Sequence, residues 1–141
     1  PPPPPPPTPT MSGLTVTPTP FRAARTGTAV TTNPRVGARV AFQANVALTG
    51  AFTVQRATPG IRAGTRCAPR PRRVPRGARA CVRWVGLGTF GTTSAAGSNA
   101  FRLTGRVAGK TLTPGSYRLS AVPRAGGRTG AAVLAGFRII R

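Results

Sequence analysis

The sequence contains no aspartate, no glutamate and no histidine. Without acidic side chains, no salt bridge between side chains can form within the chain. General acid and base catalysis usually draws on these missing residues, and only Lys110 and Tyr117 remain as candidates beside two cysteines. Structural roles explain both residues more simply, and no glycine-rich phosphate loop opens a helix. The composition therefore predicts a protein that is not an enzyme.

Cysteine is scarce, since only Cys67 and Cys81 are present. Two thiols with no histidine or carboxylate cannot supply the four ligands that structural zinc takes, and calcium prefers several carboxylates. We therefore expect no metal and no cofactor. In an exported protein the pair would form a disulfide, and closing a loop of about 15 residues contributes roughly 3 kcal/mol. A reduced intracellular pair is the alternative.

Long apolar runs are missing as well. The best candidate, residues 131–140, has about half the length of a membrane-spanning helix and is interrupted by Gly136 and Arg138. We therefore expect no membrane span. The sequence starts inside a proline run without an initiator methionine or a signal peptide, so we expect a processed product or the C-terminal part of a longer protein.

Positive charge is abundant: twenty arginines and one lysine give a formal net charge of +21. Such a chain attracts polyanions, so the expected partners are nucleic acid, cell-wall polymer or acidic polysaccharide, bound without sequence specificity. Arginine also favours bidentate contacts with phosphate and carboxylate groups. The codon usage of a GC-rich genome is an alternative source of the arginines, but it does not explain the missing acids.

The segment between the cysteines, APRPRRVPRGARA, holds five arginines and three prolines in thirteen residues. Its flanks, GIRAGTRC and CVRWVGL, are predicted to form the two strands of a hairpin that the disulfide fastens. The arginines either bind polyanions or are simply solvated around a structural disulfide. The candidate polyanion-binding residues are Arg66, Arg70, Arg72, Arg73, Arg76, Arg79 and Arg83.

The first ten residues, PPPPPPPTPT, predict a polyproline II segment, and seven prolines would span roughly 22 Å. We interpret residues 1–10 as a stiff linker and residues 11–141 as one domain. Two alternatives are a ligand for a proline-binding domain and a strut packed against a neighbouring subunit.

Apolar and polar residues alternate in most of the remaining segments, which is typical of half-buried strands. The segment FRLTGRV is the clearest case, with Phe101, Leu103 and Val107 predicted to face a core and Thr104 to face outward. The other residues predicted to face inward are Leu14, Val16, Val40, Phe42, Ala44, Phe52, Val54, Tyr117, Leu119, Ala121, Val133, Ala135, Phe137 and Ile139.

Turn signals separate these segments at short intervals, for example Thr113-Pro114-Gly115. About seven strands predict an all-β, immunoglobulin-like sandwich of two antiparallel sheets. In the segment LTPGSYRL, Tyr117 is predicted to be a corner tyrosine whose hydroxyl bonds back to the backbone. Trp84 is predicted to lie in the core.

The strings FRLTGRVAGKTLTPGSYRL and CVRWVGLGTF, with two cysteines that bracket a basic loop, suggest a family. Residues 11–141 resemble the arginine-rich immunoglobulin-like domains at the C-termini of exported proteins of high-GC Gram-positive bacteria. The resemblance implies an extracellular or surface domain without known enzymatic activity. The sequence departs from that pattern at Gln55, where such domains commonly carry a glutamate, and in its complete lack of acids.

Three functions fit these observations. The first is a structural or adhesive surface module, and the second is a nonspecific polyanion-binding domain. The third is a subunit of a self-assembling extracellular fibre, a homopolymer in which edge strands or the proline segment would link the copies. The charge of +21 opposes the third, because stacked subunits would repel one another.

Overall fold

The computed structural model describes residues 2–141, and this part of the chain contains strands, turns and loops but no helix. The predicted all-β class is therefore confirmed. The strands are β1 (Met11–Thr17), β2 (Phe21–Arg22), β3 (Val30–Thr31), β4 (Ala38–Ala44), β5 (Leu48–Ala63), β6 (Arg66–Pro69), β7 (Ala80–Ser94), β8 (Gly97–Leu103), β9 (Arg106–Val107), β10 (Lys110–Thr111), β11 (Gly115–Ala125), β12 (Arg128–Thr129) and β13 (Val133–Ile140). Several are only two residues long, so their number exceeds the predicted seven.

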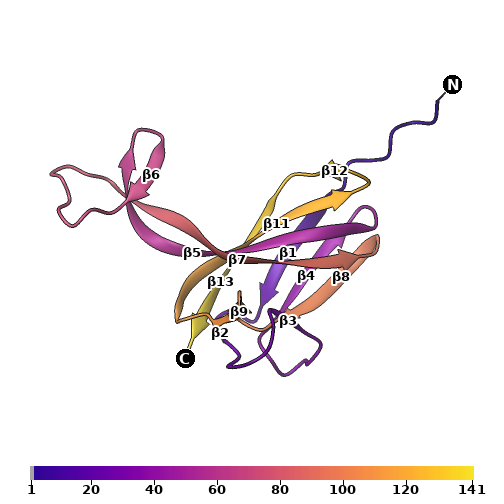
Figure 1. The fold of residues 1–141 in the computed structure, drawn as a ribbon, viewed down its shortest axis with the longest axis horizontal. Coiled ribbons are helices and arrows are strands. Elements are labelled where there is room, and N and C mark those ends of the chain that lie inside the picture. Colours follow the sequence, from indigo (N-terminus) through magenta and orange to yellow (C-terminus); the bar gives the residue numbers. More distant parts are fainter. Residues whose placement is uncertain (1) are drawn as a thin grey trace.

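Two sheets make up the body of the molecule (Figure 1). The smaller sheet has the order β1-β4-β8-β3. The larger sheet has the order β2-β13-β11-β5, and β5 also pairs with both β6 and β7. The strand β2 runs parallel to β13, so the larger sheet is mixed instead of purely antiparallel as predicted.

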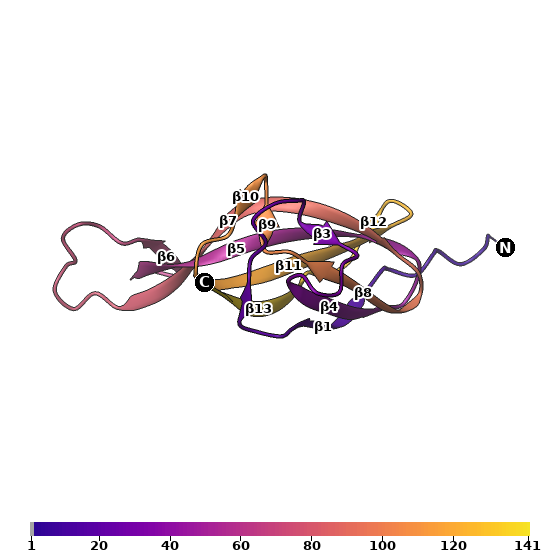
Figure 2. The same cartoon turned by 90° about the horizontal axis from the view of Figure 1, so that it is seen from below.

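The core lies between the two sheets, which face each other in the view of Figure 2. Phe52 of the larger sheet is the centre of an aromatic cluster, with ring centroids 6.2 Å from Phe42 and 5.2 Å from Phe101 of the smaller sheet. The alternation predicted for β4, β11 and the end of β13 is confirmed, because every second residue is buried. Burial of this apolar surface is the main source of stability.

The prediction that FRLTGRV forms one strand is wrong. β8 ends at Leu103, and Arg106 and Val107 form β9 in a separate two-stranded sheet with β10. Thr104 between them is buried, and its hydroxyl donates to the Thr28 carbonyl oxygen at 2.6 Å. Thr104, which the alternation predicted to face outward, thus hydrogen-bonds to backbone groups inside the domain, and the strand ends before it.

The proline-rich segment is attached to the domain at its C-terminal end. Pro9 is fully buried, and its carbonyl oxygen lies where a Cβ on Gly130 would be. Asn45 holds the same segment from both sides, since Thr10 N–H donates to its side-chain oxygen and its amide donates to the Thr8 carbonyl. Residues 2–8 are exposed. The division into a polyproline linker at 1–10 and a domain at 11–141 stays a prediction.

A long arm projects from the body at the end opposite the N-terminal segment (Figures 1 and 2). The arm exists because β5 and β7 extend beyond the rest of the larger sheet. β5 pairs with β7 from Leu48 to Ile61, whereas its pairing with β11 ends at Arg56. Residues 58–83, which we call the arm, include the ends of both strands, the short β6 and the loop that follows it.

Candidate functional site: an arginine-rich arm

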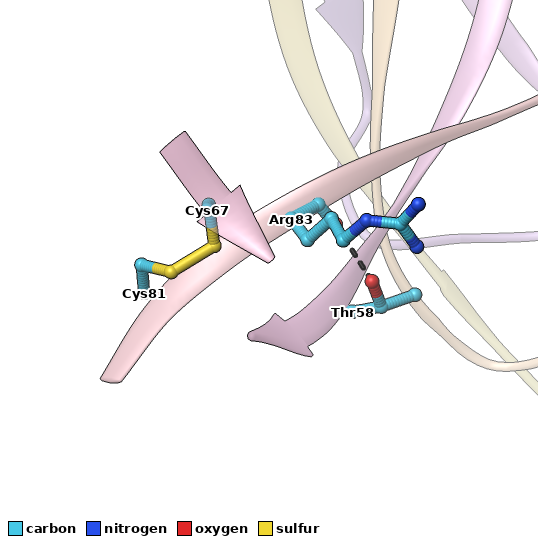
Figure 3. The surroundings of a disulfide bond; sticks show 4 residues. All are labelled: Thr58, Cys67, Cys81 and Arg83. Atoms are coloured by element: carbon cyan, nitrogen blue, oxygen red, sulfur yellow. Dashed lines mark hydrogen bonds between the residues drawn. A yellow bond between two sulfur atoms is a disulfide. The ribbon is translucent and has the colours of Figure 1, made fainter. Parts of the chain in front are cut away.

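The arm is a three-stranded ribbon with β5 in its centre. β5 turns directly into β6 through Gly64 and Thr65, and Gly64 has φ 65°, which suits the first loop residue of a type II′ hairpin. β7 pairs with the other edge of β5. At the root of the arm the Thr58 hydroxyl donates to the Arg83 carbonyl oxygen at 2.8 Å (Figure 3). This side-chain hydrogen bond adds to the backbone pairing between β5 and β7.

A disulfide joins Cys67 to Cys81, as the sequence predicts, with their Cα atoms 6.1 Å apart. Cys67 is opposite Arg62 on one edge of β5, and Cys81 is opposite Gly60 on the other edge. The bond therefore connects the two outer strands across the central one. It passes so close to Gly60 that a Cβ there would lie 2.5 Å from the Cys67 sulfur and 3.3 Å from the Cys81 sulfur.

The predicted hairpin between the cysteine flanks differs from the observed one. GIRAGTRC meets CVRWVGL only at Gly60, which is opposite Cys81: the first segment is itself the β5–β6 hairpin, and the rest of the second pairs with the part of β5 that precedes Gly60. Periodicity suggested both strands but carried no information about which strand lies between them. The disulfide thus braces a ribbon of three strands.

The arm concentrates the positive charge of the chain. It holds eight arginines in 26 residues, against thirteen cationic residues in the other 115. Five of the eight are in or directly at the ends of the loop between β6 and β7, and all eight except the half-buried Arg83 are exposed. They are Arg62, Arg66, Arg70, Arg72, Arg73, Arg76, Arg79 and Arg83.

None of these eight guanidinium groups donates a hydrogen bond to another group in residues 2–141. Their backbone, in contrast, is held: Arg62 N–H donates to the Arg79 carbonyl at 2.9 Å, and Ala78 N–H donates to the Pro75 carbonyl at 3.1 Å. Gly77 takes φ 77° in the same turn. Side-chain donors without acceptors in residues 2–141, carried by strands and by a loop that is braced at its ends, are suited to binding anionic groups.

Five of the twelve arginines in the body are used differently, because their side chains donate hydrogen bonds within residues 2–141. Arg106 donates to the carbonyl oxygens of Gly27, Arg25 and Gly109, so it fastens a loop to β9 and β10. Arg102 donates from two of its nitrogens to the carbonyls of Val36 and Gly37. These guanidinium groups replace missing backbone partners and are structural.

All seven predicted polyanion-binding arginines lie in the arm, six of them exposed and Arg83 half-buried at its root. Sequence reasoning missed Arg62, which is exposed on β5 opposite Cys67. It lies outside the loop between the cysteines, and its place in the arm follows only from the tight β5–β6 turn. The Gly64-Thr65 pair was the available signal for that turn.

Trp84 is not in the core, contrary to the sequence prediction. It is half-buried on β7, and the Arg118 guanidinium lies over its ring at 4.3 Å from the centroid. The Arg118 Nε also donates to the Gln55 side-chain oxygen across the β5–β11 pair. A β5 residue with a short side chain, Ala57, is opposite Trp84 in the register. The indole ring is thus covered by a cation instead of by apolar residues.

Tyr117 is buried in the larger sheet, and its hydroxyl donates to the Thr113 carbonyl oxygen at 2.6 Å. Its ring stacks on Phe137 with centroids 5.6 Å apart. The bond spans the turn that leads into β11, so Tyr117 fixes the way in which this strand enters the sheet.

Further chemical features are few. The described residues contain no group of three or more histidine, cysteine or acidic side chains that could hold a metal ion. No helix of residues 2–141 has the length and hydrophobicity needed to cross a membrane. Comparison with models of known protein families gave no match, and comparison with curated proteins gave none either.

Proposed function

We propose that this chain is a non-enzymatic extracellular attachment module that holds anionic polymers with its arm. The observation that carries the proposal is a set of guanidinium groups, exposed except for Arg83 and without acceptors in residues 2–141, on a disulfide-braced ribbon that projects from the body (Figure 1). The polymers share closely spaced phosphate, sulfate or carboxylate groups, as wall polymers, acidic polysaccharides and nucleic acids do.

Bracing favours binding for an entropic reason. A flexible loop of arginines would lose conformational freedom when it binds, and this loss would reduce the affinity. In the arm the disulfide and the pairing to β5 hold the strands at both ends of the loop, and the turn at Gly77 holds part of the loop itself. The like charges repel one another, and a bound polyanion relieves that repulsion. Both effects support affinity at this place in the molecule.

The chemistry of the arm supports recognition of charge and not of bases. Sequence-specific reading of a single strand needs exposed aromatic rings for stacking, and the one tryptophan is covered by Arg118. No recognition helix is present in the described part of the chain. We therefore propose nonspecific binding that weakens steeply with salt.

We further propose an immunoglobulin-like architecture and an extracellular location. The back-bond from Tyr117 to Thr113 and the two facing sheets support the first. The Cys67–Cys81 disulfide supports the second, because such bonds persist in oxidising surroundings. Attachment then takes place at one end of the domain, opposite the end where the proline-rich segment leaves it (Figure 2).

The test compares two triple variants of equal charge. Arg72→Gln, Arg73→Gln and Arg76→Gln change the arm, whereas a control variant changes three exposed body arginines that donate no side-chain hydrogen bond within residues 2–141. The control substitutions are Arg22→Gln, Arg35→Gln and Arg124→Gln. Affinity is measured at low salt for random-sequence duplex DNA, for heparin and for neutral dextran.

We expect the arm variant to bind both polyanions at least about tenfold more weakly than the unchanged protein, and the control variant to lose less than about threefold. Dextran should not bind to any of the three. Equal losses in the two variants would contradict the proposal, because attraction would then depend on net charge and not on the arm. Preference for one polyanion would identify the natural class of polymer.

A further inference from the structure

A second feature of the molecule is an incompletely paired strand in the smaller sheet. β3 pairs with β8 only at two positions, Val30 with Leu103 and Thr31 with Arg102. The chain then leaves the sheet at Thr32. On this side of β8, no strand of residues 2–141 lies beside residues 97–101, although all five pair with β4 on the other side.

The free backbone groups can be assigned by alternation. Thr104 N–H donates to the Ala29 carbonyl, which lies on the β3 side. Because successive residues of a strand direct their backbone groups to opposite sides, Arg102, Ala100 and Ser98 direct theirs to the β3 side. β3 satisfies Arg102, but no backbone group within residues 2–141 pairs with Ala100 or Ser98 there.

A pocket of about 430 Å³ lies beside this free edge. Val30, Pro34 and Phe101 contribute apolar surface to its wall, and Arg39 and Arg102 contribute charge. Phe101 is one of the partly buried residues at the margin of the core, in edge contact with Phe90 at 5.9 Å. The pocket therefore combines an apolar wall with two cations.

The two cations lie directly opposite each other in the β4–β8 register. Like charges in this position destabilise a sheet. Arg102 is held in place by two hydrogen bonds of 3.0 Å to the carbonyls of Val36 and Gly37, and Arg39 is exposed. No side-chain carboxylate exists in the chain to compensate the pair. A carboxylate supplied from outside would do so.

We propose that the free edge of β8 accepts an extended acidic peptide of another protein as an additional strand. The peptide backbone pairs with Ala100 and Ser98 and continues the line of β3. An acidic side chain on the outer face reaches Arg39 and Arg102, and the next side chain, which is apolar, lies against Phe101. Main-chain pairing provides affinity in such strand addition, and pockets for alternate side chains provide specificity.

The charge of the partner follows from the charge of this chain. A second copy offers no side-chain carboxylate and adds a charge of +21, so it cannot compensate the arginine pair. The site is also separate from the arm, which is built from residues 58–83 of the larger sheet. Peptide binding at the β8 edge is thus independent of polymer binding by the arm.

The probe is a short acetylated peptide of alternating valine and glutamate, measured by calorimetry and by amide chemical shifts of the labelled full chain. Ala100→Pro removes the outward N–H without removing a bond to β4, because proline is tolerated on the free side of an edge strand. Ala100→Val is the matched control, since it adds similar bulk and keeps the N–H. Arg39→Gln tests the charge.

We expect the peptide to shift and protect the Ala100 and Ser98 amides. Ala100→Pro should weaken binding about tenfold relative to Ala100→Val, as loss of one hydrogen bond predicts, and Arg39→Gln should weaken it roughly two- to fivefold. The triple arm variant should bind the peptide as the unchanged protein does. A peptide of the same composition with N-methylated backbone amides should not bind, and this result does not depend on how Ala100→Pro folds.

Three results would overturn the inference. The N-methylated peptide could bind equally well, which would mean that charge alone attracts it. The shifted amides could lie in the arm, which would make the peptide a ligand of the other site. A lysine peptide of the same alternation could bind as tightly, which would remove the role of Arg39 and Arg102.

Discussion

At the scale of single residues, Gly60 determines whether the arm can be braced at all. A disulfide between strands on the two sides of β5 must cross the central backbone, and it crosses where no side chain is present. We predict that Gly60→Ala lowers the free energy of unfolding by about 1–3 kcal/mol, the usual cost of overpacking. Denaturant unfolding of the oxidised protein measures this change.

The control is Gly91→Ala on β7, where an added Cβ would meet only the Gly50 carbonyl oxygen at 3.7 Å. We expect it to cost much less than Gly60→Ala. Reduction of the disulfide should diminish the cost at Gly60 without removing it, because the Ala68 carbonyl oxygen lies 2.7 Å from the same Cβ. An unchanged cost after reduction would show that the sulfur atoms are not the obstacle.

The arginines show at the same scale what a sequence can and cannot predict. Arg106 and Arg72 are the same residue type, yet Arg106 fastens a loop and the Arg72 guanidinium donates no hydrogen bond within residues 2–141. The difference depends on carbonyl oxygens more than 75 residues away along the chain for Arg106. Composition predicts an anionic partner, but only the fold separates the structural arginines from the candidate binding ones.

At the scale of elements, the disulfide joins β6 to β7 at the far end of the molecule and should mainly stabilise the arm. We predict that replacing Cys67 and Cys81 with alanine lowers the free energy of unfolding by about 3 kcal/mol, as expected for a loop of about 15 residues. In this variant, residues 58–83 should exchange through local opening of the arm, at a lower free energy than the global unfolding that exposes the amides of β4 and β11. A single exchange free energy for the arm and the body would contradict a local role.

The alternation of apolar and polar residues predicted those strands that have one face on the core and the other in solvent. It did so because successive side chains of a strand point to opposite faces. It succeeded for Val40 and Phe42 on β4 and for Tyr117 on β11. It failed at Thr104, which bonds inward, and for the order of strands around β5. A period of two residues carries no information about which distant strands pair or which side chains hydrogen-bond to the backbone.

At the scale of the whole molecule, the missing acids leave little to titrate. Neither aspartate, glutamate nor histidine is present, so the folded and unfolded states bind the same number of protons over a wide range. We predict that the free energy of unfolding is constant from about pH 4.5 to about pH 6.5. Denaturant titrations across this range measure it, and a change above about 0.5 kcal/mol would mean that another group titrates.

The central claim is that the arm, and not the net charge of +21, holds the polymer. The most direct measurement is the slope of log affinity against log salt for duplex DNA, which changes by about 0.9 for each phosphate neutralised. We predict that the Arg72, Arg73 and Arg76 variant has a slope shallower by about 2 to 3, and that the Arg22, Arg35 and Arg124 variant changes it by less than about 1. Equal slopes in the two variants would contradict the claim.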